Sequence, residues 1–336
     1  MNDRARMPAA SGRPVAPPVK VLYVAVKGRS GSTLVDSVLG EVSGFLAAGE
    51  VRFVWDVLDQ GFLCGCSKPV RECELWSVVL ERALGAGPDG SYLIPPSAVS
   101  TWYRDIYRWR RGRRLLRIAR GRSAPWPALD RYTEVVSRLY AALADLTGAR
   151  VIVDSSKWAT DPVLLGLVPG VEPYCLHLVR DPRAVAHSFR RRKKWPDRQT
   201  SMPRYPSAYS ALSWLVRNML LERVRRRLPL RHYLRMRYED FVSDPVTWLD
   251  AITGFVGERQ ASFPFLEGKL VRVGSNHIVS GNPDRLFTGE LELREDNEWV
   301  RRMGRFDRAL TTLLTLPRLG RYGYPLRASE RGEHRR

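Results

Sequence analysis

The segment spanning residues 19–40 constrains the fold of this chain more than any other part. It opens with VKVLYVAV, a short and nearly continuous apolar run that is typical of a strand buried on both faces of a parallel sheet. The small residues GRSGST follow at 28–33, and the apolar residues of TLVDSVLG then recur at helical spacing. A strand, a glycine-rich turn and a helix in this order form the context that a phosphate-binding loop requires.

The loop itself has the chemistry of an anion site. Gly28 and Gly31 let the backbone wrap around an anion, and the N–H groups of residues 30–34 would point at it from the start of a helix. Arg29 adds a forked cation that suits phosphate or sulfate, and hydroxyl donors come from Ser30, Ser32 and Thr33. ATPase loops read GxxxxGKS/T, whereas here no Lys precedes the hydroxyl pair and no acidic strand end is evident for magnesium. The loop therefore favours an anion bound without a metal, although a capped glycine- and serine-rich turn has the same pattern.

Further strand signals predict the fold class. They occur at 149–156, 173–180 and 232–238. Each precedes a predicted helix, and two of those helices begin at Asp-Pro pairs, 181–182 and 244–245. Alternating strands and helices predict a parallel sheet with helices on both faces, a three-layer α/β fold similar to that of P-loop NTPases, over residues 19–326.

The remaining segments are less regular. Residues 70–148 hold two or three predicted helices, so we expect a helical insertion between the first two strands, forming the acceptor side of a site. Residues 193–206 predict a long exposed loop, and residues 257–296 have no regular pattern. We expect a disordered leader over 1–18 and a disordered tail over 327–336.

The composition is strongly basic. A net charge of +20 favours an anionic partner, which can be nucleic acid, phospholipid or a phosphorylated small molecule. The arginine blocks indicate solvated basic faces around an anionic site, and no nucleic-acid-binding fingerprint is evident. No apolar run of about 18 residues and no secretory signal occur, so we expect no membrane span and a cytoplasmic location.

The four cysteines have no obvious joint role in the sequence. Cys64, Cys66 and Cys73 cluster in CGCSKPVREC, but no fourth Cys or His follows at zinc-finger spacing. We therefore expect no metal here and interpret the segment as a surface hairpin with reduced thiols or a reversible disulfide. Cys175 lies in an apolar run and is expected to be buried.

A second segment, HLVRDPRAVAHS at 177–188, has the pattern of another anion contact. Arg180 ends a predicted strand, where ligands of open α/β sheets bind. Ser188 follows about two turns into the next helix, so the two side chains can clamp a phosphate together. An Asp-Pro helix start with a surface arginine is the alternative.

Together the two segments resemble the cofactor motifs of sulfotransferases that use 3′-phosphoadenosine 5′-phosphosulfate (PAPS), and bacterial members in particular. Other similar stretches are DSSK at 154–157, MRYEDFVSDP at 236–245, NHIVSGNPDR at 276–285 and LCGCSKPVRECELW at 63–76. Each motif alone is weak, but their order and spacing from residue 19 to about residue 300 are specific.

The resemblance implies how a cofactor would be bound. The first loop would hold the 5′-phosphosulfate, and Arg180 with Ser188 would hold the 3′-phosphate. Arg285 belongs to a closing segment, SGNPDR, which departs from the RKG of cytosolic members. The implied cofactor-binding residues are Arg29, Ser30, Gly31, Ser32, Thr33, Leu34, Arg180, Ser188 and Arg285, with no metal and with adenosine 3′,5′-bisphosphate as product.

The resemblance also implies catalytic roles. Glu50 would be the base, Lys157 would donate to the bridging oxygen, and Arg29 would neutralise the leaving phosphate. His277 is the rival base or a substrate contact. The alternative for both Glu50 and Lys157, from their positions alone, is an exposed residue at the start of an element. His177 is expected to be structural, and His187 to support the site from behind.

The predicted function is transfer of a sulfuryl group to a hydroxyl or amine of a small-molecule, carbohydrate or peptide acceptor. The acceptor and the oligomeric state stay open. A nucleotide or small-molecule kinase with a variant loop is the nearest alternative enzyme, and a basic nucleic-acid-binding protein is the alternative of another class. Aromatic residues that can stack on an acceptor, or simply pack in the core, are Trp102, Tyr103, Trp109, Trp126 and Trp195.

Overall fold

A parallel sheet forms the centre of the computed structural model, which describes residues 17–58, 60–108, 111–119, 121, 125–195, 201–226 and 232–326. The strands are β1 (Val19–Ala25), β2 (Phe45–Gly49), β3 (Val151–Asp154), β4 (Val171–Val179) and β5 (Tyr233–Arg237). Their order is β2-β3-β1-β4-β5, and all neighbours are parallel. The central position of β1 explains its continuous apolar sequence, because both of its faces are covered.

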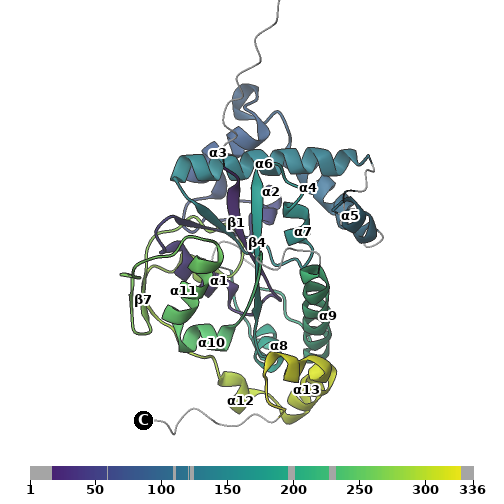
Figure 1. Cartoon of the computed structure of the whole chain (residues 1–336), viewed down its shortest axis with the longest axis vertical. Coiled ribbons are helices and arrows are strands. Elements are labelled where there is room, and N and C mark those ends of the chain that lie inside the picture. Colours follow the sequence, from purple (N-terminus) through teal and green to yellow (C-terminus); the bar gives the residue numbers. More distant parts are fainter. Residues whose placement is uncertain are drawn as a thin grey trace, which may run out of the picture.

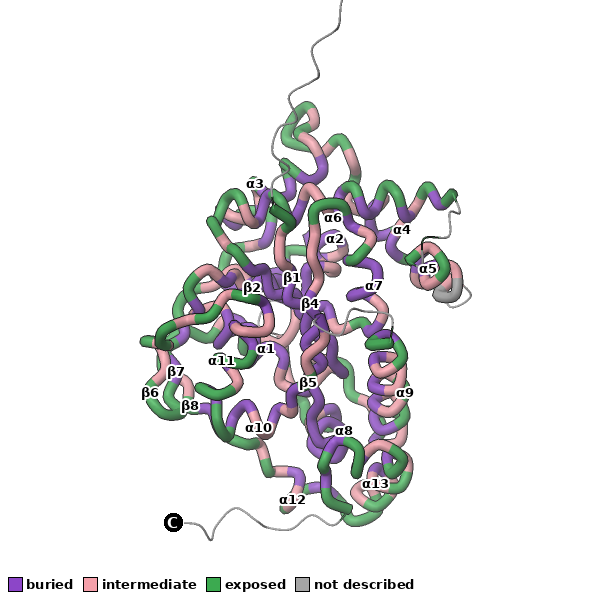
Figure 2. Tube along the Cα trace, in the orientation of Figure 1, coloured by how far each residue is buried: buried purple, intermediate pink, exposed green. Residues whose placement is uncertain are grey.

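Successive residues of β1 point into two different cores. Val21, Tyr23 and Ala25 contribute to one cluster, and Leu22 and Val24 to the other. The first cluster is covered by α3, α4, α6 and α7, and the second by α1, α10 and α11. Figure 2 shows β1 and β4 as largely buried. The predicted three-layer α/β fold is therefore confirmed.

The helices alternate with the strands as far as residue 255. In chain order they are α1 (Ser32–Gly40), α2 (Val54–Val57), α3 (Glu74–Leu84), α4 (Pro96–Ile106), α5 (Gly112–Ile118), α6 (Pro127–Thr147), α7 (Asp161–Leu165), α8 (Pro182–Arg190), α9 (Ser207–Arg225), α10 (Tyr238–Ser243) and α11 (Pro245–Phe255). Asp181 caps α8 by accepting a bond from the N–H of Arg183, and Asp244 caps α11 in the same way through Thr247. Both Asp-Pro helix starts lie where the sequence predicts them.

The insertion is helical but begins one strand later than predicted. It follows β2, which is an edge strand. The residues of β2, FLAAG, are mostly small and weakly strand-forming, so this strand has little sequence signal. The chain then runs through α3, α4, α5 and the long α6 before returning in β3, as Figure 1 shows.

The segment after α11 is more regular than its sequence indicates. It contains a small antiparallel sheet of β6 (Leu266–Glu267), β7 (Leu270–Val273) and β8 (Gly289–Glu292), in that order. These strands are too short for a clear alternation of apolar and polar residues. The chain ends in α12 (Glu298–Arg302) and α13 (Arg305–Leu319), which pack on α8.

Both expected disordered ends lie largely outside the described residues, since 1–16 and 327–336 are not among them. Within the part of the chain that is described, no helix combines the length and apolar character needed to cross a membrane.

Candidate active site

The loop between β1 and α1 makes a tight turn at the carboxyl edge of the sheet. Arg29 and Gly31 have positive φ angles of 70° and 90°, so the backbone reverses just before α1 begins at Ser32. A Cβ atom on Gly31 would lie 2.4 Å from the ring of Tyr238, which explains why glycine is needed there. The first N–H groups of a helix have no partner within it, so the start of α1 provides anion donors.

Arg180 joins the second motif directly to this loop. Its Nη1 donates to the backbone carbonyl of Arg29 at 3.1 Å, and its guanidinium lies 4.6 Å from the centre of the Tyr238 ring. Its Nη2 is 3.2 Å from the carboxylate of Asp296. Burial alone would raise the pKa of Asp296, but the neighbouring Arg180 guanidinium helps to lower it. The two segments are far apart in sequence but meet at one edge of the sheet, as the resemblance requires.

A cavity of about 870 Å³ opens at this edge. Most of the predicted site residues line it, namely Arg29, Gly31, Ser32, Thr33, Leu34, Glu50, Lys157, Arg180 and Ser188. They come from the ends of β1, β2, β3 and β4, from the first turn of α1 and from the second turn of α8. This is the place where ligands bind in open α/β sheets, and the volume suits a nucleotide-sized ligand.

Glu50 and Lys157 form an ion pair within the cavity wall. Glu50 follows β2 and is held by its N–H, which donates to the carbonyl of Val279 at 2.9 Å. Lys157 follows β3 with a φ of 72° and donates from Nζ to Glu50 Oε1. Two residues that are distant in sequence thus provide a carboxylate and an ammonium group in contact, next to the anion loop.

Three predicted residues lie behind the cavity wall rather than in it. Ser30 is buried and 1% exposed. Arg285 donates to the carbonyl of Leu63 at 3.0 Å, so it joins the closing segment to the loop before α3 instead of facing a phosphate. His277 Nδ1 faces the thiols of Cys64 and Cys73, and the residue does not line the cavity.

The structure adds cations that the sequence did not single out. Three of these cations follow directly after α8 and line the cavity, namely Arg191, Arg192 and Lys193. Arg294 lines it as well. Lys193 Nζ pairs with Asp284 at 2.6 Å. In the sequence the first three of these cations belong to a basic block at 189–195, a pattern that is also typical of a solvated surface. The position of this block directly after the second motif is the signal that links it to the anion site.

The apolar end of the cavity comes from two segments. Phe53, Val57 and Phe62 follow β2, and Trp195 and Met202 flank the short stretch of the 193–206 loop that lies outside the described residues. No described residue of the 70–148 insertion lines the cavity, so we do not retain it as the acceptor side.

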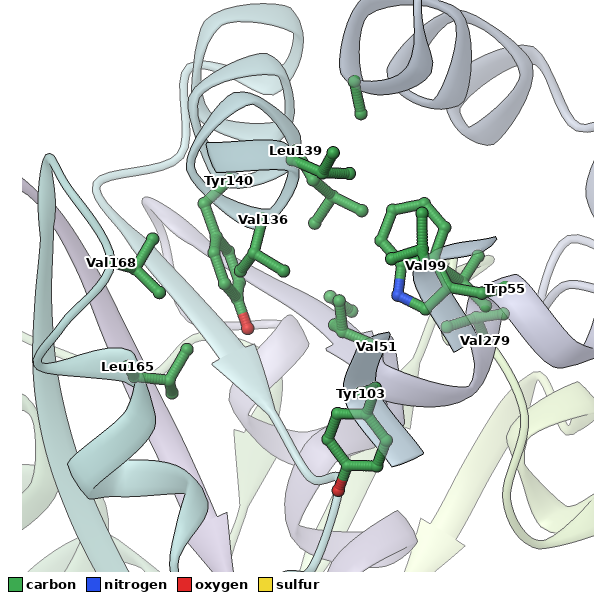
Figure 3. Packing of buried hydrophobic residues seen from close by; sticks show 14 of the residues in the cluster. Val51, Trp55, Val99, Tyr103, Val136, Leu139, Tyr140, Leu165, Val168 and Val279 are labelled. Atoms are coloured by element: carbon green, nitrogen blue, oxygen red, sulfur yellow. The ribbon is translucent and has the colours of Figure 1, made fainter. Parts of the chain in front are cut away.

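The insertion instead packs against the residues that follow β2, behind the cavity wall. Arg52 lies 4.5 Å from the ring of Tyr103 on α4 and 4.8 Å from that of Trp158. Figure 3 shows Val51 and Trp55 beside Val99 and Tyr103 in the buried cluster. Among the aromatic residues proposed for stacking, Tyr103 and Trp126 are buried in this cluster, Trp102 packs against it, and Trp109 lies outside the described residues.

The two other histidines considered do not line the cavity. His177 is fully buried in β4, between the Tyr233 hydroxyl at 2.5 Å and Asn218 Oδ1 at 2.7 Å. Burial lowers its pKa to about 4, so the ring is neutral at physiological pH. His187 lies 4.0 Å from Glu298, and burial lowers its pKa as well.

The fold and this cavity define an α/β protein with a cluster of anion donors at the carboxyl edge of its sheet. Residues 172–261, which include Arg180 and Ser188, match the model described as "Sulfotransferase family". Over these residues the chain is similar to the sulfotransferase family.

Comparison with solved structures bears on the fold. The sulfotransferase domain from the curacin biosynthetic pathway is 15% identical, with a TM-score of 0.51, over 93% of this chain and 99% of that one. The sulfotransferase domain from the Synechococcus PCC 7002 olefin synthase is 18% identical, with a TM-score of 0.47, over 93% and 98%. The first likeness shows the fold of a sulfotransferase domain. No curated protein matches the chain.

Proposed function

We propose that the protein transfers a sulfuryl group from PAPS to a hydroxyl or amine of an acceptor that enters at the apolar end of the cavity. The observation that carries this proposal is the contact between Arg180 and the Arg29 carbonyl, which brings both anion-binding motifs to one cavity. The family match over residues 172–261 and the fold support sulfotransfer as the class of activity.

The residues present suit a donor with phosphate groups at both ends. The N–H groups at the start of α1, the hydroxyls of Ser32 and Thr33 and the Arg29 guanidinium are donors for the phosphosulfate end. Arg180 and Ser188 are donors for the 3′-phosphate, with Arg191 and Arg192 nearby. The bound donor would supply the activated sulfuryl group itself.

The reacting groups follow from the same geometry. The acceptor oxygen or nitrogen would form the new bond to sulfur while the bond from sulfur to the 5′-phosphate oxygen breaks. Glu50 would accept the acceptor's proton, and Lys157 would donate a hydrogen bond to the departing oxygen. Their ion pair would have to open, or be replaced by contacts to substrate, before Glu50 acts as base.

Incubation with PAPS carrying labelled sulfate, followed by mass spectrometry of an acceptor panel or cell extract, tests the activity. The proposal predicts a product heavier by one sulfate and release of adenosine 3′,5′-bisphosphate. Turnover of ATP, with no sulfated product in any fraction, would overturn it.

A thermal shift assay separates the alternatives. Adenosine 3′,5′-bisphosphate should raise the melting temperature without added metal, whereas ATP with magnesium should not. A kinase would respond in the opposite way. Stabilisation by DNA at physiological salt, with none by the bisphosphate, would favour the nucleic-acid-binding alternative.

A further inference from the structure

Three cysteine thiols and one histidine ring converge behind the cavity wall. Cys64 and Cys66 lie in the loop before α3, Cys73 lies at the N-terminus of α3, and His277 comes from the segment after β7. Their ligand atoms all lie within 4.8 Å of one another. His277 Nδ1 is 3.3 Å from Cys73 Sγ and 3.7 Å from Cys64 Sγ.

These distances match the edges of a small tetrahedron. Zinc bonds of about 2.3 Å to sulfur and about 2.0 Å to nitrogen give a tetrahedral sulfur–nitrogen edge of roughly 3.6 Å. The two observed sulfur–nitrogen distances lie on either side of that value. Thiolate and imidazole ligands are those that zinc binds, whereas magnesium and calcium prefer oxygen.

We propose that Cys64, Cys66, Cys73 and His277 bind one structural zinc ion. A site with four protein ligands is closed, so the ion would have no open position for water or substrate. The spacing that argued against a metal in the sequence is explained by the fold, because the fourth ligand lies 204 residues after Cys73.

The chain encloses the cluster tightly. Gly65 is needed between the first two cysteines, because a Cβ there would lie 1.8 Å from the side-chain oxygen of Asn276. Cys64 and Cys73 are both fully buried, which shields the site from water.

The ion would fix the segment that closes the cavity. Gly65 N–H donates to the carbonyl of Ile278 at 3.0 Å, and Trp76 Nε1 donates to that of His277 at 2.8 Å. Val279 in turn pairs with Ala48 and Glu50 at 3.0 and 2.9 Å. A zinc crosslink at His277 therefore holds residues 278–282 beside the predicted base, where 280–282 line the cavity.

The metal content of the reduced full-length chain, expressed without a histidine tag and with zinc in the medium, tests this proposal. We expect one zinc per chain. Cys73→Ser and His277→Ala should each lose most of it, while Cys175→Ala, which removes a buried cysteine of β4, should keep it. Cobalt added to the metal-free chain should give the visible bands of a tetrahedral thiolate site.

A second measurement keeps the test decisive if a ligand variant fails to fold. In the wild-type chain, a strong chelator should expose Cys64, Cys66 and Cys73 to alkylation and lower the melting temperature, while Cys175 stays protected. Substoichiometric zinc with no uptake of added zinc or cobalt would overturn the proposal. So would unchanged zinc in Cys73→Ser, or a disulfide among the three thiols in the reduced preparation.

Discussion

At the scale of single residues, the pair of Glu50 and Lys157 is the feature on which the proposed chemistry depends. The two side chains meet at the cavity wall although they follow different strands. Lys157 Nζ donates to Glu50 Oε1, so each residue positions the other before substrate binds.

Replacing Glu50 by Gln should separate binding from turnover. The variant removes the proposed base but keeps a side chain of similar size, so we expect kcat to fall about 10²- to 10⁴-fold. Affinity for adenosine 3′,5′-bisphosphate, measured by calorimetry, should change little. Glu267→Gln, an exposed change on β6, is the matched control. Full activity in Glu50→Gln would show that another group is the base.

Replacing Gly31 by Ala should damage the loop. The new Cβ would lie 2.4 Å from the Tyr238 ring and would need a φ of 90°, so we expect a loss of about 1–3 kcal/mol in unfolding free energy and weaker nucleotide binding. Gly28→Ala is the control, because its Cβ would meet Phe189 at an ordinary 3.5 Å. Thermal unfolding of both variants checks this, and equal melting temperatures would contradict it.

The sequence places single residues where local pattern decides their position. Arg180 follows directly on the buried strand β4, and Arg29 lies in the loop after β1. His277 and Arg285 lie behind the cavity wall, where their partners come from more than 200 residues earlier in the chain. No local pattern contains that information.

At the scale of elements, the strands buried on both faces were the predictable ones. β1, β3 and β4 carry apolar runs that follow from burial in the sheet. No such apolar run occurs in the edge strand β2, which consists mostly of small residues, or in the short strands β6 to β8. The role of the 70–148 insertion also depended on packing, since its helices cover one face of the sheet and leave the cavity to other segments.

The contact between α1 and the end of β3 should make stability depend on pH. Burial raises the pKa of Asp36 to about 8, with a further increase from Asp154 and Glu50, while Ser155 and Lys157 oppose it. The folded chain therefore binds a proton here that the unfolded chain has lost above about pH 4. The stability that this proton contributes is complete below that pH and is lost as the pH rises through 8.

Asp36→Asn tests this element by removing the titrating group. We expect the unfolding free energy of the wild type, relative to the variant, to fall between about pH 5 and pH 8. Urea unfolding of both chains at several pH values measures it. Parallel curves across this range would show that Asp36 does not titrate there.

At the scale of the whole molecule, part of the positive charge lies at the cavity. Arg191, Arg192 and Arg294 are exposed and line it, so their attraction for a multiply charged donor acts through solvent. The sequence predicted an anionic partner from net charge alone, but only the fold shows which arginines converge. Tertiary structure, not composition, selects among the possible partners.

Salt should weaken binding of the charged nucleotide. Raising ionic strength from about 0.01 M to about 1 M shortens the screening length from about 30 Å to about 3 Å. We therefore expect the affinity for adenosine 3′,5′-bisphosphate to fall across this range, while that for uncharged adenosine stays nearly constant. Calorimetry on both ligands checks the effect, and an equal response of the two would argue against a cationic site.

The central claim is that two separate motifs bind the two ends of one donor. Calorimetric titration with adenosine 3′,5′-bisphosphate and with adenosine 5′-monophosphate tests it most directly, on the wild type and on Arg180→Met. The wild type should prefer the bisphosphate by about tenfold or more, and the variant should lose that preference while keeping its fold by circular dichroism. Equal affinity of the wild type for both nucleotides, or an unchanged preference in Arg180→Met, would contradict the account.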